Sequence, residues 1–447
     1  MVHRISSSGP RAASTPRTEG TPAVRTRALT SSAADSGFTA GATSAPERLS
    51  GADAVAAQAK LDAISRFVAS RHVDRAGEGR ILDILKNASP KELNYLVTKL
   101  DLHELAESMD DRLIGPDNRT AFFQLLTHDR VGDLSVPARV ALVNALQRGH
   151  TDKREERAIC DVFLATKGSE LTALKNGIDA GDYRDLQQLV FHDIDDEGVR
   201  RSILDHIKAE ARPTGEVKVL SDIDDTFYEN WKDTRFPKKT VYPGVKAFYA
   251  ELDRGAHARP GRTGDLAFVT ARPGDPAGAV ETLTRKMLKD KGVDATVLTG
   301  DLTSNLSNEK IAQKKFENFQ QYQQLFPEYG FVFTGDSGQG DVLFGVKMRQ
   351  AMPDAVKGVF INDVVNTPAE KRAELRSQGV YLTDTYVGAA TEAFRLGLIG
   401  QEGLARVVAA AKQDFGKIAF SSDAQRAARQ AELDRDVTAA ERALATA

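Results

Sequence analysis

The sequence lacks the features that mark an extracellular or membrane-spanning protein. It has one cysteine in 447 residues, Cys160, so no internal disulfide can form. No apolar stretch approaches the roughly 18–20 residues that cross a bilayer, and the first residues carry an arginine without the apolar run of a secretory signal. The formal net charge of -3 gives no reason to expect nucleic-acid binding. We therefore expect a cytoplasmic protein, with any membrane contact peripheral.

The first 50 residues have few apolar side chains and are rich in Ser, Thr, Ala, Gly and Pro. Such a segment buries too little apolar surface to offset the entropy lost on ordering, so we expect a disordered tail over residues 1–50. Its arginines outnumber its acids up to residue 34. A transport signal of a translocated or secreted protein is the alternative interpretation.

Residues 51–213 have the apolar periodicity of helices throughout. Ser89 followed by Pro90 predicts one helix start, and Asp117 or Asn118 predicts another. The segment beginning at Ile81 resembles the one beginning at Ile159, with identities at a constant offset of 78 residues. We expect an all-helical domain with an internal repeat. It shows no catalytic pattern, and a protein partner is one role for it.

From residue 214 to about residue 400, the sequence pattern changes to short β-rich runs that alternate with helical stretches. This alternation predicts an α/β domain with a parallel sheet covered on both faces. Residues 401–447 return to helical periodicity and end in a mostly polar segment. We expect the last segment to be an exposed helix or a helix that binds a partner.

Acidic side chains follow the first and fourth predicted strands of this α/β domain. Asp222 and Asp224 follow VKVL, and Asp336 and Asp341 lie in GDSGQGD. Because ligands of open parallel sheets bind at the carboxyl ends of strands, these carboxylates are expected in one crevice, where Mg2+ would relieve their repulsion. The first acid suits nucleophilic attack on phosphorus, and the second suits proton transfer.

Two further groups stand between the acid pairs in the sequence. Thr270 ends the second predicted strand, and its hydroxyl can bind a phosphoryl oxygen. A predicted helix then carries three lysines, any of which can neutralise nucleophile and phosphate: Lys310, Lys314 and Lys315. The order of acid pair, hydroxyl, lysine and acid pair predicts a phosphoryl-transfer centre.

These four motifs resemble those of the haloacid dehalogenase (HAD) superfamily. SDIDDT, YPGVKAFYAEL, FVTARP, GDSGQGD and FINDV further resemble the catalytic domain of the actin-patch-protein type of phosphatidate phosphatase, a relative of the lipin catalytic domain, over residues 215–400. The resemblance implies a Rossmann-like parallel sheet with little or no cap, and Mg2+ as cofactor. After GDSGQGD, the chain reads VLFGVKM and departs from the family pattern.

Site roles follow from the resemblance by position. It implies that the chemistry rests on Asp222 (nucleophile and metal ligand), Asp224 (acid and base, with its backbone carbonyl toward the metal), Thr270 (phosphate binding), Asp336 (metal ligand) and Asp341 (support of the metal). The register of the apolar residues before Pro327 favours Lys315 as the lysine, with Lys310 and Lys314 as alternatives. We also expect substrate contacts from Thr226, Arg272 and Gln339.

The expected substrate is a phosphomonoester, and the resemblance implies phosphatidate. The 48 residues from Asp222 to Thr270 leave no room for a large cap, so a bulky substrate can enter. The loop that contains the only tryptophan, Trp231, also contains four basic residues, a composition that suits an anionic membrane surface. A soluble or protein phosphate is the alternative substrate, and a partner-binding helical module on an idle HAD scaffold is the alternative function.

Overall fold

The computed structural model describes residues 49–69, 73–109, 117–181, 184–257, 266–273, 279–293, 295–300 and 307–446. Within these ranges, the side chains of residues 270–273, 279–282 and 299–300 are not described. Nearly all of the expected N-terminal tail, residues 1–48, lies outside the described residues.

The helical region begins at Gly51, as the periodicity predicts. Its α-helices are α1 (Gly51–Val68), α2 (Arg75–Asn87), α3 (Pro90–Lys99), α4 (Leu102–Ser108), α5 (Asn118–Gln124), α6 (Val136–Leu146), α7 (Lys153–Ala165), α8 (Gly168–Asp179), α9 (Leu186–Gln188) and α10 (Glu197–Glu210). Ser89 caps α3 in a capping box with Glu92, and Pro90 is its first residue. Asp117 caps α5 through the backbone N–H of Thr120. Both predicted helix starts are therefore confirmed.

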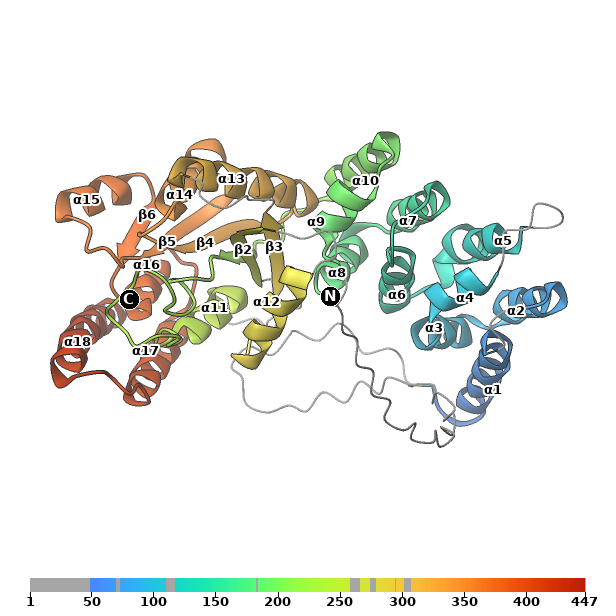
Figure 1. The fold of residues 1–447 in the computed structure, drawn as a ribbon, viewed down its shortest axis with the longest axis horizontal. Coiled ribbons are helices and arrows are strands. Elements are labelled where there is room, and N and C mark those ends of the chain that lie inside the picture. Colours follow the sequence, from blue (N-terminus) through green and yellow to red (C-terminus); the bar gives the residue numbers. More distant parts are fainter. Residues whose placement is uncertain are drawn as a thin grey trace, which may run out of the picture. The chain divides into compact units, whose positions relative to one another are not determined.

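The internal repeat is longer than the sequence comparison indicates. Helices α2 and α7, which Figure 1 labels, have the same length at the offset of 78 residues, and α3 and α8 start at that offset. Next in each copy, a helix ends in a π-helical turn, Leu125–Asp129 in the first and Leu189–Asp193 in the second. Both turns follow a glutamine and end in His-Asp, but their offset is 64 residues. The first copy contains the additional helix α4, which breaks the constant spacing.

The α/β region contains a parallel sheet of six strands in the described residues, as expected for the fold class. The strands are β1 (Val217–Ser221), β2 (Leu266–Pro273), β3 (Thr296–Gly300), β4 (Gly330–Asp336), β5 (Val356–Asn362) and β6 (Val380–Thr383). Their order is β3-β2-β1-β4-β5-β6, so β1 and β4 lie side by side at the centre. Strands β1, β4 and β5 are almost wholly buried because helices cover both faces, whereas β6 at the edge is mostly half-buried.

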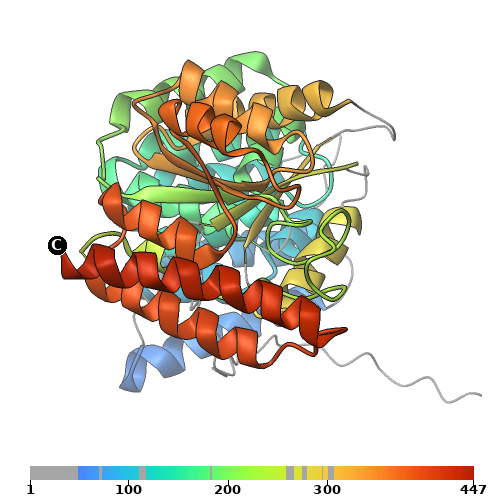
Figure 2. The ribbon, with the colours of Figure 1, turned by 90° about the vertical axis from the view of Figure 1, so that its left-hand side faces the viewer.

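Helices form a layer on each side of the sheet (Figure 2). They are α11 (Val245–Arg254), α12 (Ala279–Asp290), α13 (Asn308–Leu325), α14 (Asp341–Ala351), α15 (Ala369–Ser377), α16 (Tyr386–Arg395), α17 (Gln401–Gly416) and α18 (Asp423–Ala445). Helices α13, α14 and α15 share one core with one face of the sheet, and α11, α12 and α16 share another core with the opposite face.

The two C-terminal helices belong to the second of these cores. Phe415 of α17 and Leu433 and Val437 of α18 are buried with Phe248 and Tyr386. Most of α18 is exposed, as the polar sequence predicts, but three buried residues on one face hold it against the domain. Residues 401–446 therefore pack as part of the α/β unit.

The helical region shares its core with the sheet face that carries α13. Lys175 of α8 forms a buried ion pair with Glu328, with Nζ and Oε1 2.7 Å apart, and Asn176 donates to the hydroxyl of Tyr329 at 2.8 Å. Asp179 accepts a hydrogen bond from Tyr322 of α13 at 2.6 Å. Across the described residues, no helix has both the length and the apolar character needed to span a bilayer.

Candidate active site

Three acids meet where the strand order reverses, at the carboxyl ends of β1 and β4. Ligands of open parallel sheets bind at such a point. Asp222 follows β1, Asp336 is the last residue of β4, and Asp341 is the first residue of α14. All three are buried, and one carboxylate oxygen of each lies within 4.8 Å of the others. The geometry therefore unites three of the four acids expected at the site.

Lys315 of α13 is the cation that faces these acids. Its Nζ lies 2.6 Å from Asp222 Oδ1 and 2.6 Å from Asp341 Oδ1. Although burial lowers the pKa of Lys315, the two carboxylates raise it above its ordinary value, so the ammonium stays charged. Lys310 and Lys314 instead line an open groove between α13 and α14.

One lysine does not balance three buried carboxylates. Burial raises the pKa of Asp222 to about 7; Lys315 opposes this shift, and the charges of Asp341 and Asp224 add to it. Burial and then the charges of Asp341 and Asp222 hold the pKa of Asp336 well above its ordinary value. Asp222 Oδ2 and Asp336 Oδ2 are also buried without a hydrogen-bond partner. A divalent cation, which prefers carboxylate oxygens, would supply both the missing positive charge and a partner for these two oxygens.

The turn after β4 brings Asp341 close because Gly335 has no side chain. A Cβ at Gly335 would lie 2.6 Å from Asp341 Oδ2, so any larger residue would displace this carboxylate. Asp336 turns one carboxylate oxygen toward the chain and accepts the N–H of Gly338 at 2.6 Å. The predicted glycine turn thus sets the spacing between the second pair of acids.

The third acid of the first motif, Asp225, faces the backbone rather than the other acids. The carboxylate of Asp225, whose φ is 59°, accepts backbone N–H groups from residues 230 to 233. These hydrogen bonds fold residues 228–242 into a compact loop, which we call the rim loop.

The rim loop places Asn230 against Asp224. The Asn230 Nδ2 donates to Asp224 Oδ1 at 2.7 Å, and Lys239 Nζ donates to Asn230 Oδ1. Asp224 is half-buried, and this contact fixes the direction of its carboxylate. Sequence reasoning missed Asn230 because nothing in a loop sequence shows which side chain turns back to the motif.

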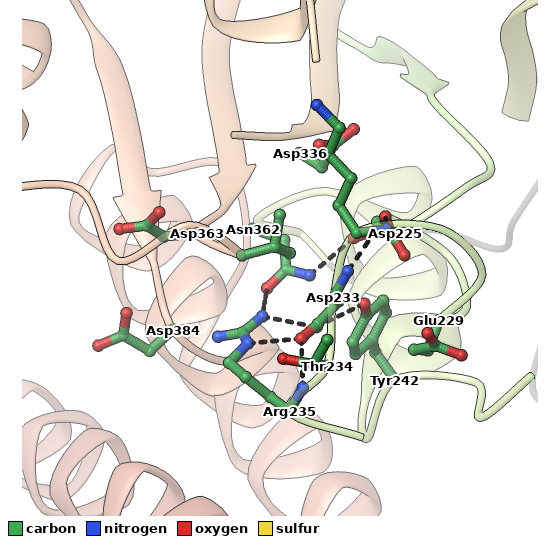
Figure 3. Close-up of polar contacts among 12 residues, drawn as sticks. Asp225, Glu229, Asp233, Thr234, Arg235, Tyr242, Asp336, Asn362, Asp363 and Asp384 are labelled. Atoms are coloured by element: carbon green, nitrogen blue, oxygen red, sulfur yellow. Dashed lines mark hydrogen bonds and ion pairs between the residues drawn. The ribbon is translucent and has the colours of Figure 1, made fainter. Parts of the chain in front are cut away.

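Buried polar contacts fix the rest of the rim loop (Figure 3). Asp233 accepts hydrogen bonds from Arg235 and, at 2.7 Å, from the hydroxyl of Tyr242. Asn362 at the end of β5 accepts from Arg235 at 3.2 Å and donates to the carbonyl of Asp225 at 2.8 Å. The loop is therefore tied to the sheet at the edge that carries the acids.

The other residues expected to contact the substrate do not belong to the acidic cluster. Thr226 is buried, and its hydroxyl oxygen has no hydrogen-bond partner. Gln339 is half-buried in the turn between Asp336 and Asp341. The side chains of Thr270 and Arg272 lie outside the described residues. The strand expected to end at Thr270 continues to Pro273, and its pairing with β3 shifts register over these last residues.

Comparison with protein families identifies the domain that holds these acids. Residues 217–363 match the family described as phosphatidate phosphatase APP1, catalytic domain. The segment is therefore similar to a catalytic domain of the phosphatidate phosphatase type. The protein is therefore an enzyme of the phosphoric monoester hydrolase class, as the sequence resemblance predicted. The matched segment runs from the first residue of β1 to the residue after β5 and so includes the buried acids, Lys315 and the rim loop. No curated protein and no solved structure in the comparisons matched the chain.

Proposed function

We propose that this enzyme is a Mg2+-dependent phosphatase that converts phosphatidate to diacylglycerol and phosphate. The observation that carries the proposal is the buried cluster of Asp222, Asp336 and Asp341 around Lys315, within the matched phosphatase domain. The motifs and the strand order also agree with the HAD superfamily.

In the proposed mechanism, Asp222 attacks the phosphorus atom and forms an aspartyl-phosphate. Its carboxylate is buried and held through Oδ1 by Lys315 at 2.6 Å, which orients it for attack. Lys315 favours the ionised form of this carboxylate and neutralises charge on the transferring group.

Asp224 would serve as the acid and then the base. It donates a proton to the departing alkoxide of diacylglycerol, and afterwards it takes a proton from the water that hydrolyses the aspartyl-phosphate. Asn230 holds its carboxylate in one direction between the two steps. We assign phosphate contacts to Thr226, Thr270 and Arg272, and a contact with substrate to Gln339.

Asp222, Asp336 and the backbone carbonyl of Asp224 would hold Mg2+, with Asp341 in support. When bound, the ion would balance the surplus negative charge of the cluster and stabilise charge on the phosphoryl oxygens. The fit rests on the two partnerless carboxylate oxygens and on the hard oxygen donors present.

The test is Mg2+-dependent phosphate release from phosphatidate in mixed micelles and, separately, from a soluble aryl phosphate. Asp222→Asn is the control, since the amide keeps the shape but cannot attack. Release from phosphatidate that disappears in Asp222→Asn supports the proposal. Release from the aryl phosphate alone would keep the chemistry and exclude the lipid. No release from either substrate by folded protein would favour a helical partner-binding module on an idle scaffold.

A further inference from the structure

The rim loop separates its charges between interior and surface. Its acids, Glu229 and Asp233, are fully buried, as is Asp225 just before it, whereas Lys232, Lys238 and Lys239 are exposed. Glu229 is bound by Lys238 Nζ at 2.7 Å and by the backbone N–H of Lys239 at 3.0 Å. The loop has four basic residues against two acids, and burial of the acids leaves cationic side chains facing solvent.

A second segment adds to this cationic surface. Lys291, which follows α12, donates to the backbone carbonyl of Lys239 at 3.3 Å. The ammonium groups of Lys239 and Lys291 lie 5.2 and 4.6 Å from the ring centre of Tyr228. In the part of the chain that the structure describes, neither lysine forms an ion pair with a carboxylate. Burial and then the charges of Lys239 and Lys246 lower the pKa of Lys291, which shows how closely these cations gather.

Trp231 lies on the same loop with 67% of its surface exposed. Its backbone N–H donates to Asp225 at 3.0 Å, so the buried acid holds the backbone beneath the exposed ring. A tryptophan placed in this way loses little conformational entropy when it enters an interface. Its amphipathic ring suits the headgroup level of a bilayer.

The residue that follows the exposed tryptophan contacts the turn between two acids of the cluster. The neighbouring Lys232 donates through Nζ to the carbonyl of Gly338 at 2.7 Å, in the turn that connects Asp336 to Asp341. A Cβ at Gly338 would also meet Val364, and the next residue, Val365, is 53% exposed. Apolar and cationic side chains therefore border the turn that carries the second pair of acids.

We propose that the rim loop and Lys291 form a docking face for an anionic lipid surface, with Trp231 inserted at headgroup level and the lysines facing lipid phosphates. This inference rests on the proposed function, because it explains how the acidic cluster reaches a substrate that resides in a bilayer. Charge complementarity selects an anionic surface over a neutral one.

The unmodified full-length protein provides a direct assay, because Trp231 is its only tryptophan. We expect its fluorescence to shift to shorter wavelength with vesicles of phosphatidylcholine and phosphatidylserine, and not with phosphatidylcholine alone. Phosphatidylserine is chosen because it is anionic but is not a phosphomonoester, so binding is measured without turnover. High salt should reverse the shift because it screens the lysines.

Two variants and a matched control test the assignment. Lys291→Glu should lower vesicle partitioning at least about fivefold, the effect of one cation near an anionic membrane. Trp231→Ala should lower partitioning measured by sedimentation. Lys357→Glu replaces an exposed lysine near the start of β5, at the end of the strands opposite the acids, and should leave partitioning unchanged. Circular dichroism confirms that each variant is folded.

The outcomes separate this proposal from the proposed function. Equal partitioning onto anionic and neutral vesicles, or equal partitioning of Lys291→Glu and Lys357→Glu, would overturn the docking face even if phosphatidate is hydrolysed. The protein could also bind anionic vesicles, with weaker binding by Lys291→Glu, and yet release no phosphate from phosphatidate. This result would support the docking face and refute the proposed substrate. Turnover of a soluble aryl phosphate should be the same in Lys291→Glu and wild type.

Discussion

The buried lysine of the acidic cluster allows a matched comparison with a second buried lysine of the same chain. Lys315 pairs with Asp222 and Asp341 at 2.6 Å each, with 4% of its side chain exposed. Lys175 pairs with Glu328 at 2.7 Å, with 2% exposed. Replacement of either lysine by methionine leaves carboxylate buried without its cation, which typically costs about 3–5 kcal/mol of unfolding free energy.

The two variants should differ in their response to Mg2+. In Lys315→Met the freed carboxylates belong to the cluster that we expect to hold the ion, so Mg2+ should restore much of the lost stability. An ion at 100 times its dissociation constant stabilises the folded state by about 2.7 kcal/mol. In Lys175→Met, the carboxylate left without its cation is Glu328, which lies outside the acidic cluster. Mg2+ should therefore stabilise this variant no more than it stabilises the wild type.

The assay is urea unfolding of wild type, Lys315→Met and Lys175→Met, each with Mg2+ and with a chelator. Lys315→Met should also lose about 10²–10³ in phosphatase turnover, the usual effect of removing one charge-stabilising group. Equal stabilisation of both variants by Mg2+ would refute the assignment of the ion to the acidic cluster. So would a Lys315→Met protein as stable as wild type in chelator.

Three further predictions concern the same cluster and its neighbours. Asn230→Ala should reduce turnover of an alkyl phosphate by about 10²-fold or more and of an aryl phosphate far less, because only the poor alkoxide leaving group needs the proton of Asp224. The control is Gln425→Ala, which removes a contact with the loop carbonyl of Thr234. Equal losses of turnover on both substrates would contradict this role of Asn230. Because the pKa of Asp222 is raised to about 7, protons compete with Mg2+ for its carboxylate below that pH. Thermal-shift titration should therefore show an affinity for Mg2+ about 30-fold weaker at pH 5.5 than at pH 8. An affinity that does not change with pH would contradict this competition. Gly335→Ala should displace the nearby carboxylate of Asp341 and weaken Mg2+ binding in isothermal calorimetry, whereas unchanged binding would show that the close approach is unnecessary.

The sequence predicted the fold class and the acids because both depend on local pattern. A β-rich run followed by acids places carboxylates at a strand end, and alternation with helices makes the sheet parallel. Asp222 and Asp336 follow β1 and end β4 in the structure. That β1 and β4 are neighbours depends on the strand order, which no single segment encodes.

The role of Asp225 could not be predicted for the same reason. In sequence it is one more acid in a run of acids, and its separate function depends on a backbone with φ of 59° and on N–H groups five to eight residues away. The C-terminal helix α18 is similar, since its three buried residues acquire partners only after the chain has folded. The repeat was predicted only as far as its offset stayed constant.

The most direct measurement is the stereochemical course of the reaction at phosphorus. A phosphomonoester made chiral at phosphorus with oxygen isotopes and sulfur should give product with retained configuration, because attack by Asp222 and then by water inverts the configuration twice. Inverted configuration would show that water attacks the substrate directly, and would contradict an aspartyl-phosphate on Asp222.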